Sequence, residues 1–217
     1  MARPRTPAGR ARRVHERLAL EYPGSAVELC ELDHRTPFEL LAATILSAQC
    51  TDARVNLVTP HLFVRFPSPV DLADADPLEV EEIIRSTGFY KNKAKSLIGM
   101  ANALLDRFDG AVPEAMADWV AVPGAGRKTA NVVRSVALGL PGLPVDTHVL
   151  RLSHRLGLTA ETDPVKVERA LNPMIPAAER GQFSLRMILH GRRVCFARKP
   201  SCATCVLADF CPSVGAV

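Results

Sequence analysis

The C-terminal segment CFARKPSCATCVLADFC, residues 195–211, holds four of the six cysteines of the chain. Cys195, Cys202, Cys205 and Cys211 follow the spacing C-x6-C-x2-C-x5-C. Four thiolates can bind either a zinc ion or an iron–sulfur cluster. Zinc sites more often use two C-x2-C pairs, of which this segment has one, and the spacing also differs from the common ferredoxin patterns. By spacing alone, both kinds of metal site stay open.

Disulfide bonds are not expected between these cysteines. The N-terminus MARPRTPAGRARRV has no apolar segment of the kind found in secretory signals. Its arginines are typical of a mitochondrial presequence too, but its low serine content favours a short disordered basic tail. We therefore expect a cytoplasmic protein in a reducing compartment, where disulfides are rare. Cys30 and Cys50 lie outside the cluster and are expected to be buried free thiols.

Composition and charge agree with a soluble globular protein that binds a polyanion. No run reaches the ~20 apolar residues of a membrane span, so no membrane partner is expected. The net charge is +4, and no acidic residue occurs between Arg180 and Ala208. The basic residues in that stretch are Arg180, Arg186, Arg192, Arg193, Arg198 and Lys199. They form either a solvated face or a surface that contacts phosphates.

A glycine-rich turn occurs in VPGAGRKTANVVRSVALG, residues 122–139. Gly124 and Gly126 would permit a tight turn with positive φ and close approach of another molecule to the backbone. The N-terminus of the following helix would then point its free N–H groups at an anion such as a DNA phosphate. The alternative is a turn between two helices that uses glycine for its geometry alone. The pattern matches neither a P-loop nor a dinucleotide-binding fingerprint.

Lys128 follows this turn and is a candidate nucleophile. It is either an ordinary surface or phosphate-contacting lysine, or an amine in a cleft where the helix N-terminus and Arg127 disfavour its charge. A neutral amine could attack a carbon atom and form a Schiff base. Asp146, in PVDTHVLRL, could assist with proton transfers or could only cap a helix. His148 in the same segment is expected to be structural.

Apolar residues recur at spacings of three and four along most of the chain, which predicts an all-α protein of about ten helices. Helix starts are indicated by Thr36, Asp76 and Asp163, each followed by proline, and Glu39 and Glu79 are expected to complete capping boxes. Further helices are expected at about 11–21, 52–65, 91–108, 127–139, 146–156 and 180–193. The segment GLPGLP, residues 139–144, predicts a boundary between two domains.

The motifs VPGAGRKTANVV, VDTH and the cysteine spacing occur together and in order. With LLAATILSAQCTDARVN and GFYKNKAKSL, they make residues 20–213 resemble the endonuclease III family of helix-hairpin-helix DNA glycosylases. The resemblance implies a six-helix barrel domain with the helix-hairpin-helix at 30–140. It also implies that an N-terminal basic tail and helix, 1–29, pack with an iron–sulfur cluster domain at 141–217, with a DNA cleft between the domains.

The resemblance also implies roles for individual residues. Lys128 becomes the attacking amine and Asp146 the catalytic carboxylate. Cys195, Cys202, Cys205 and Cys211 become the ligands of a [4Fe–4S] cluster. The residues implied to bind DNA are Gln49, Phe89, Gly124, Gly126, Arg127, Arg198 and Lys199. Gln49 and Phe89 would fill the gap left by an extruded base. The alternative interpretations are that Gln49 is a polar residue at a helix end and that Phe89 is a core aromatic.

The implied activity is base excision repair of duplex DNA by a monomer associated with the nucleoid. The enzyme would remove oxidised or ring-saturated pyrimidines and then cut the strand by β-elimination at the abasic site. One alternative is an adenine glycosylase, which typically lacks the lysine and carries an extra C-terminal domain, whereas this chain ends six residues after Cys211. The other alternative is a non-catalytic helix-hairpin-helix DNA-binding protein with a structural metal.

Overall fold

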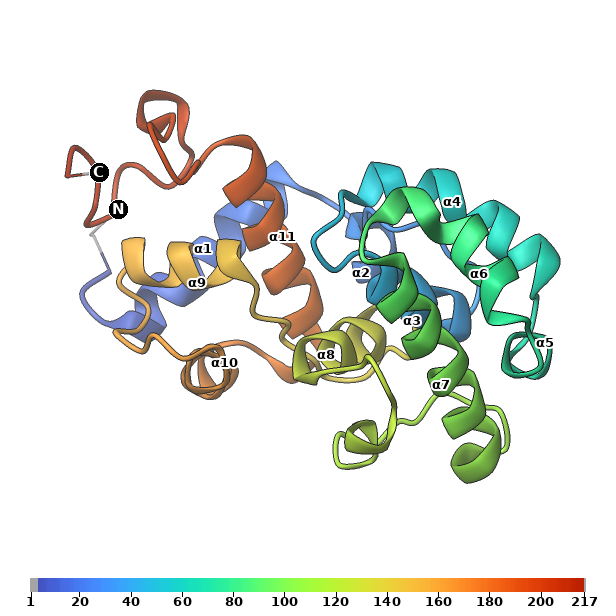
Figure 1. Ribbon diagram of the computed structural model, residues 1–217. Coiled ribbons are helices and arrows are strands. Elements are labelled where there is room, and N and C mark those ends of the chain that lie inside the picture. The colour runs from blue at the N-terminus through green and yellow to red at the C-terminus, as the bar shows by residue number, and fades with distance from the viewer. Residues whose placement is uncertain (1–3, 217) are drawn as a thin grey trace. The chain divides into compact units, whose positions relative to one another are not determined.

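The protein is described by a computed structural model that covers residues 4–216. These residues form eleven α-helices and five short 3-10 helices, without a strand among them, which confirms the all-α prediction (Figure 1). They divide into two compact units. One unit is Cys30–Leu140, and the other joins the described residues up to Leu29 to those from Pro141 onward. No helix in the described part of the chain is long and apolar enough to span a bilayer.

The Cys30–Leu140 unit is built around a buried helix, α3. Its α-helices are α3 (Pro37–Leu46), α4 (Asp52–Arg65), α5 (Pro69–Ala73), α6 (Pro77–Ile84), α7 (Tyr90–Phe108) and α8 (Arg127–Val136), with the 3-10 helices η1 (Arg85–Thr87) and η2 (Asp118–Ala121). Every residue from Phe38 to Leu46 is buried, and α3 packs against α4, α7 and α8. An α-helix that is apolar all round must be enclosed in this way.

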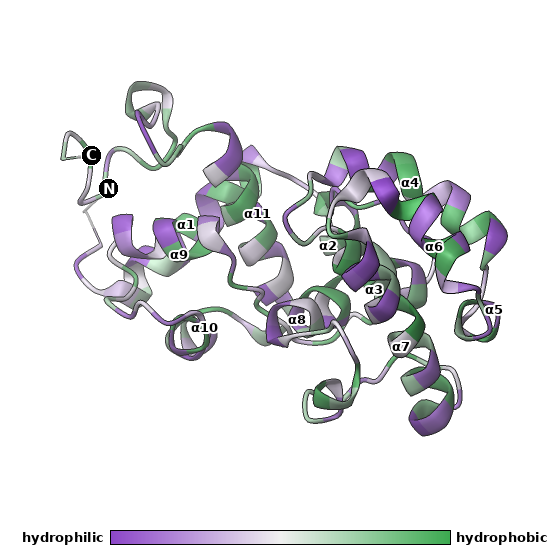
Figure 2. Cartoon of the chain, in the orientation of Figure 1, coloured by the Kyte–Doolittle hydropathy of each residue, from purple (hydrophilic) through white to green (hydrophobic). Residues whose placement is uncertain are grey.

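The second unit is organised around α11. Its α-helices are α1 (Pro7–Glu21), α2 (Ala26–Leu29), α9 (Thr147–Arg155), α10 (Pro164–Leu171) and α11 (Arg180–Arg193), with η3 (Asn172–Met174), η4 (Ala177–Glu179) and η5 (Cys202–Thr204). Helix α11 contacts α1, α2 and α9. Hydrophobic and hydrophilic residues alternate along the helices of both units, as amphipathic helices around a core require (Figure 2).

The predicted N-caps are present, but two predicted capping boxes are not. The side chains that accept a backbone N–H at a helix start are those of Thr36, Asp76 and Asp163. Glu39 does not bond back to its cap residue, because its carboxylate accepts the backbone N–H of Arg35. Glu79 instead pairs with Arg65 of α4. A complete capping box occurs where none was predicted, at the start of α5.

The N-terminal basic segment is helical from Pro7 onward, so the prediction of a disordered tail is wrong for residues 7–14. Thr6 caps α1 by accepting the N–H of Gly9. Arg10, one of the residues assigned to the tail, donates to the carbonyl of Gly157. The part of that prediction that concerns residues 1–3 lies outside the described residues.

Arg186 is not part of a solvated basic face. It is buried, with 8% of its surface exposed, and donates to the carbonyls of Tyr22 and Gly24. Arg180 donates in the same way to the carbonyl of Asn172. These two basic residues of the acid-free stretch therefore hold the second unit together.

Candidate functional site

The glycine turn joins η2 to α8, and its two glycines have different roles. Gly124 has φ +76°, and a Cβ there would lie 2.8 Å from the Cβ of Ser96, so both the conformation and the space require glycine. Gly126 has φ −81°, so the prediction of positive φ is wrong for this residue. A Cβ at Gly126 would meet no heavy atom within 4 Å, which leaves its backbone open to an approaching molecule.

Lys128 is the second residue of α8 and is exposed, as is Arg127 before it. Gly126, at the N-cap, provides no side-chain acceptor for the first N–H groups of the helix. The N-terminus of α8 therefore presents its partial positive charge together with two cationic side chains. Ala130 and Val133 fix the opposite face of α8 in the core of the Cys30–Leu140 unit.

Asp146 caps α9 in the second unit with only one of its two carboxylate oxygens. Oδ1 accepts the N–H groups of both His148 and Val149 at 2.8 Å. Among the described residues, Oδ2 has no hydrogen-bond partner, and the side chain is half-buried. The helix-cap interpretation is thus correct, and it leaves an oriented carboxylate oxygen that can take part in chemistry.

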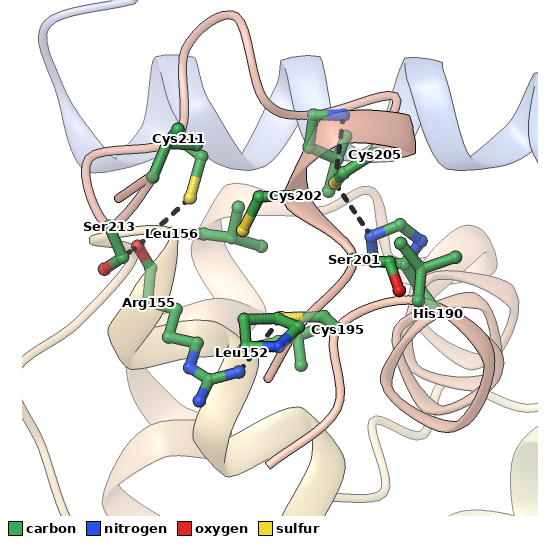
Figure 3. Close-up of a pocket in the computed structure, with 14 residues that line it drawn as sticks. Leu152, Arg155, Leu156, His190, Cys195, Ser201, Cys202, Cys205, Cys211 and Ser213 are labelled. Atoms are coloured by element: carbon green, nitrogen blue, oxygen red, sulfur yellow. Dashed lines mark hydrogen bonds between the residues drawn. The ribbon is translucent and has the colours of Figure 1, made fainter. Parts of the chain in front are cut away.

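The four clustered cysteines line one cavity of the second unit (Figure 3). All four are free thiols, and the pocket encloses about 420 Å³ of space, part of it open to solvent. Leu152, Leu156 and Leu207 supply apolar walls. Cys30 and Cys50 belong to the other unit. Neither forms a disulfide with another described cysteine, and both are half-buried rather than buried as predicted.

The donor set of the pocket fits an iron–sulfur cluster, because all four cysteines of the segment line one cavity. A [4Fe–4S] cluster needs four cysteines placed around it. Burial raises the pKa of Cys205 and of Cys211, so a bound metal would be needed to favour their thiolate forms.

Arg155 of α9 holds the loop that begins at Cys195. Its Nη1 lies 3.3 Å from Cys195 Sγ and donates to Phe196 O at 2.6 Å, while Nη2 donates to Ala197 O at 2.8 Å. Arg151, one turn earlier, donates to Cys195 O at 2.9 Å. Neither arginine is among the predicted site residues, although their spacing of four places them on one face of a helix.

His190 of α11 contacts a second cysteine of the pocket. Its Nε2 lies 3.3 Å from Cys205 Sγ (Figure 3). Its Nδ1 lies 3.2 Å from the hydroxyl of Tyr22. Burial lowers the pKa of His190 to about 4, so the ring is neutral near pH 7. A neutral ring can donate from Nε2 while it accepts the Tyr22 hydroxyl proton at Nδ1. Nothing in the sequence around His190 indicates this contact.

The residues predicted to contact DNA include most of the non-glycine residues with positive φ in the described part of the chain. In the described residues, the non-glycine residues with positive φ are Gln49, Phe89, Asp109 and Lys199. Three of these four were selected from the sequence as DNA contacts, and left-handed backbone in such residues is typical of functional sites. Arg198, next to Lys199, is also exposed. Phe89 is 64% exposed, so it is not a core aromatic.

The comparisons with known proteins agree on one family. The family described as HhH-GPD superfamily base excision DNA repair protein matches residues 42–177, and the iron–sulfur binding domain of endonuclease III matches residues 195–211. Endonuclease III of Synechocystis sp. is 54% identical over 90% of this chain and 88% of its own length. Endonuclease III of Escherichia coli K12 is 40% identical over 83% of this chain and 86% of its own length.

A solved structure gives the same result for the fold. The structure of a non-covalent endonuclease III–DNA complex matches with a TM-score of 0.87 and 42% identity, over 94% of this chain and 95% of that one. A thermostable thymine-DNA glycosylase, at 19% identity and a TM-score of 0.82, shares the fold. The chain therefore belongs to the endonuclease III family of base excision DNA repair glycosylases, in the HhH-GPD superfamily, and has that family's [4Fe–4S] cluster domain.

Proposed function

We propose that this protein is a bifunctional DNA glycosylase that removes oxidised or ring-saturated pyrimidines and then cuts the strand as an AP lyase. The observation that carries the proposal is the position of Lys128, an exposed amine in the first turn of α8 directly after the glycine turn. An adenine glycosylase typically lacks this amine. A DNA-binding protein without activity has no need of it.

The glycine turn and the N-terminus of α8 would hold a phosphate of the damaged strand. Gly126 leaves room for the phosphate, and Gly124 sets the turn that exposes the helix N-terminus. Gln49 and Phe89 would enter the duplex where the damaged base leaves it. Extrusion costs a few kcal/mol and is least costly for a base pair that is already weakened.

Lys128 would then attack C1′ of the deoxyribose in its neutral form. The nitrogen–carbon bond forms as the glycosidic bond breaks, and the base leaves with that electron pair. The carboxylate of Asp146 would stabilise positive charge on the sugar and accept the proton released from the amine. Opening of the sugar gives the Schiff base, which acidifies the hydrogens at C2′. Loss of one of these protons breaks the C3′–oxygen bond and cuts the strand.

The four cysteines of the pocket would hold the [4Fe–4S] cluster. When bound, the cluster would cross-link the C-terminal segments that carry these cysteines. The loop from Cys195 to Cys202, fixed also by Arg155, would hold Arg198 and Lys199 against DNA phosphates.

We assign the Cys30–Leu140 unit, with its six α-helices, to the barrel domain that contains the helix-hairpin-helix. The second unit, which contains the cysteine pocket, is assigned to the cluster domain. We also propose that the protein acts as a monomer in the cytoplasm, associated with the nucleoid. Size-exclusion chromatography with light scattering tests the monomer assignment, and a dimer mass would overturn it.

The proposed chemistry is tested by borohydride reduction during incubation with duplex DNA that contains an abasic site. The unaltered protein should become covalently linked to the DNA, because reduction fixes the Schiff base. Lys128→Ala should give no linkage while it still binds the DNA. Lys166→Ala, which removes an exposed lysine of α10, should be linked like the unaltered protein. Undiminished linkage of Lys128→Ala would refute the assignment. No linkage of the unaltered protein would exclude the lyase step and leave either a monofunctional glycosylase or a DNA-binding protein without activity.

A further inference from the structure

Lys93 of α7 is a buried lysine that has no role in the chemistry described above. Only 5% of the surface of this residue is exposed. Nζ donates to two backbone carbonyls at 2.8 Å, those of Leu46 and Thr87. All three residues lie in the Cys30–Leu140 unit, so the contact is internal to one compact body.

The two carbonyls belong to the segments that carry the predicted DNA-inserting residues. Leu46 ends α3, three residues before Gln49, and Thr87 ends η1, two residues before Phe89. Gln49 has φ +54° and Phe89 has φ +50°, and both side chains are exposed. One ammonium group thus connects the two strained turns, although more than forty residues of sequence separate the carbonyls that it binds.

A lysine is a costly residue for this position unless its charge is needed. Burial lowers the pKa of Lys93. None of its hydrogen bonds is to a carboxylate in the described part of the chain, and the carbonyls take that place. The carbonyl of Leu46 lies at the negative end of α3, where a cation is stabilised. An apolar residue would fill the same space but would leave both buried carbonyls without a donor.

We propose that Lys93 is a positioning residue that sets the spacing between Gln49 and Phe89 so that both can enter the DNA at one lesion. This inference rests on the proposed function, because it needs Gln49 and Phe89 to enter DNA. The hydrogen bonds of Lys93 Nζ go to the carbonyls of Leu46 and Thr87 and not to Lys128, so Lys93 is not proposed as a catalytic residue. Its removal should impair the opening of the duplex and leave the Schiff-base chemistry intact.

The test compares two substrates in single-turnover reactions at saturating protein. One is a duplex with an oxidised pyrimidine, which must be extruded from the base stack. The other is a single-stranded oligonucleotide with an abasic site, which has no stacked base to extrude. The Lys93→Met variant should react with the duplex about tenfold more slowly or slower still, because a small misplacement of positioning groups can have such an effect. Its rate on the single strand should stay within about twofold of the rate of the unaltered protein. Lys95→Met, the same change at an exposed lysine of α7, should alter neither rate.

A double-mutant cycle tests whether Lys93 acts through the two inserting residues. In a protein that already carries Gln49→Ala and Phe89→Ala, adding Lys93→Met should lower the duplex rate no further, because the groups that it positions are gone. An equal fall on both substrates, or full additivity in the cycle, would overturn the inference. If the unaltered protein is inactive on both substrates, the proposed function fails instead.

A measurement on the unaltered protein covers the case in which Lys93→Met does not fold. The N–H groups of Cys50 and Gly88 close the two turns by bonding to Ser47 and Arg85. If Lys93 couples the turns, the two amides should become exposed to deuterium exchange through the same local unfolding event. Their free energies of opening should then be equal and should fall equally with denaturant concentration. Independent openings of clearly different free energy would contradict the inference.

Discussion

At the scale of single residues, the two carboxylate oxygens of Asp146 can serve the helix cap and the proposed catalysis separately. Oδ1 accepts two N–H groups of α9, and Oδ2, which has no hydrogen-bond partner among the described residues, would face the substrate in the proposed reaction. Replacing the carboxylate by an amide keeps the first task and removes the negative charge that the second needs.

Asp146→Asn should therefore lower the single-turnover rate of base excision by about a hundredfold or more, while the free energy of unfolding stays within about 0.5 kcal/mol. Asp146→Ala should lose the same activity and also about 1 kcal/mol of stability, because the cap is removed. Excision assays and denaturant unfolding measure the two effects. Near-normal activity of Asp146→Asn would contradict the catalytic role.

Arg155 should control how firmly the cluster is held. Its planar fork bonds to two carbonyls and approaches Cys195 Sγ, which the single ammonium of a lysine cannot reproduce. Arg155→Lys should release iron to a chelator several times faster than the unaltered protein, as followed by the loss of visible absorbance. Arg12→Lys, at an exposed position of α1, is the matched control and should release iron at the normal rate. Equal rates for all three proteins would show that Arg155 does not support the cluster.

At the scale of elements, the two glycines of the turn before α8 should have different functions, one in the stability of the fold and the other in DNA binding. Gly124→Ala should lower the free energy of unfolding by about 1–3 kcal/mol, because the new Cβ meets Ser96 in a conformation that alanine disfavours. Gly126→Ala should change stability by less than about 0.5 kcal/mol, because its φ is ordinary and its Cβ would meet open space. It should nevertheless weaken DNA binding, measured by fluorescence anisotropy. Unchanged affinity would mean that no phosphate approaches Gly126.

Helix starts were predictable because their signals are local. Thr36, Asp76 and Asp163 each stand directly before a proline and cap a helix as expected. The partners of Glu39 and Glu79 were not predictable from the same motif, because Arg35 and Arg65 compete for their carboxylates. The start of α5 has an equally local signal, which sequence reasoning overlooked.

The supporting side chains of the site could not be predicted, because their roles depend on contacts between distant segments. Lys93 lies in the polar sequence YKNKAK, and it is buried because α7 packs against other segments, including α3 and η1, whose carbonyls it binds. His190 and Arg186 likewise look like surface residues of a basic stretch. The residues implied to act on DNA were found from their motifs, and their roles in the reaction stay predictions.

At the scale of the whole molecule, binding should depend on salt through phosphate contacts from exposed cations such as Arg198 and Lys199. The logarithm of the association constant should fall linearly with the logarithm of the salt concentration. Lys199→Ala should reduce the slope by about 0.9 if it removes one phosphate contact, and should weaken binding to all sequences alike. An unchanged slope would show that the cysteine loop does not reach the DNA backbone.

The central claim is that one amine, that of Lys128, forms the covalent bond to the sugar. The most direct measurement is mass spectrometry of the borohydride-reduced complex after digestion of both the protein and the DNA. We expect a single reduced sugar adduct on Nζ of Lys128. An adduct on a different lysine or on the N-terminal amine would contradict it, even if the protein were fully active.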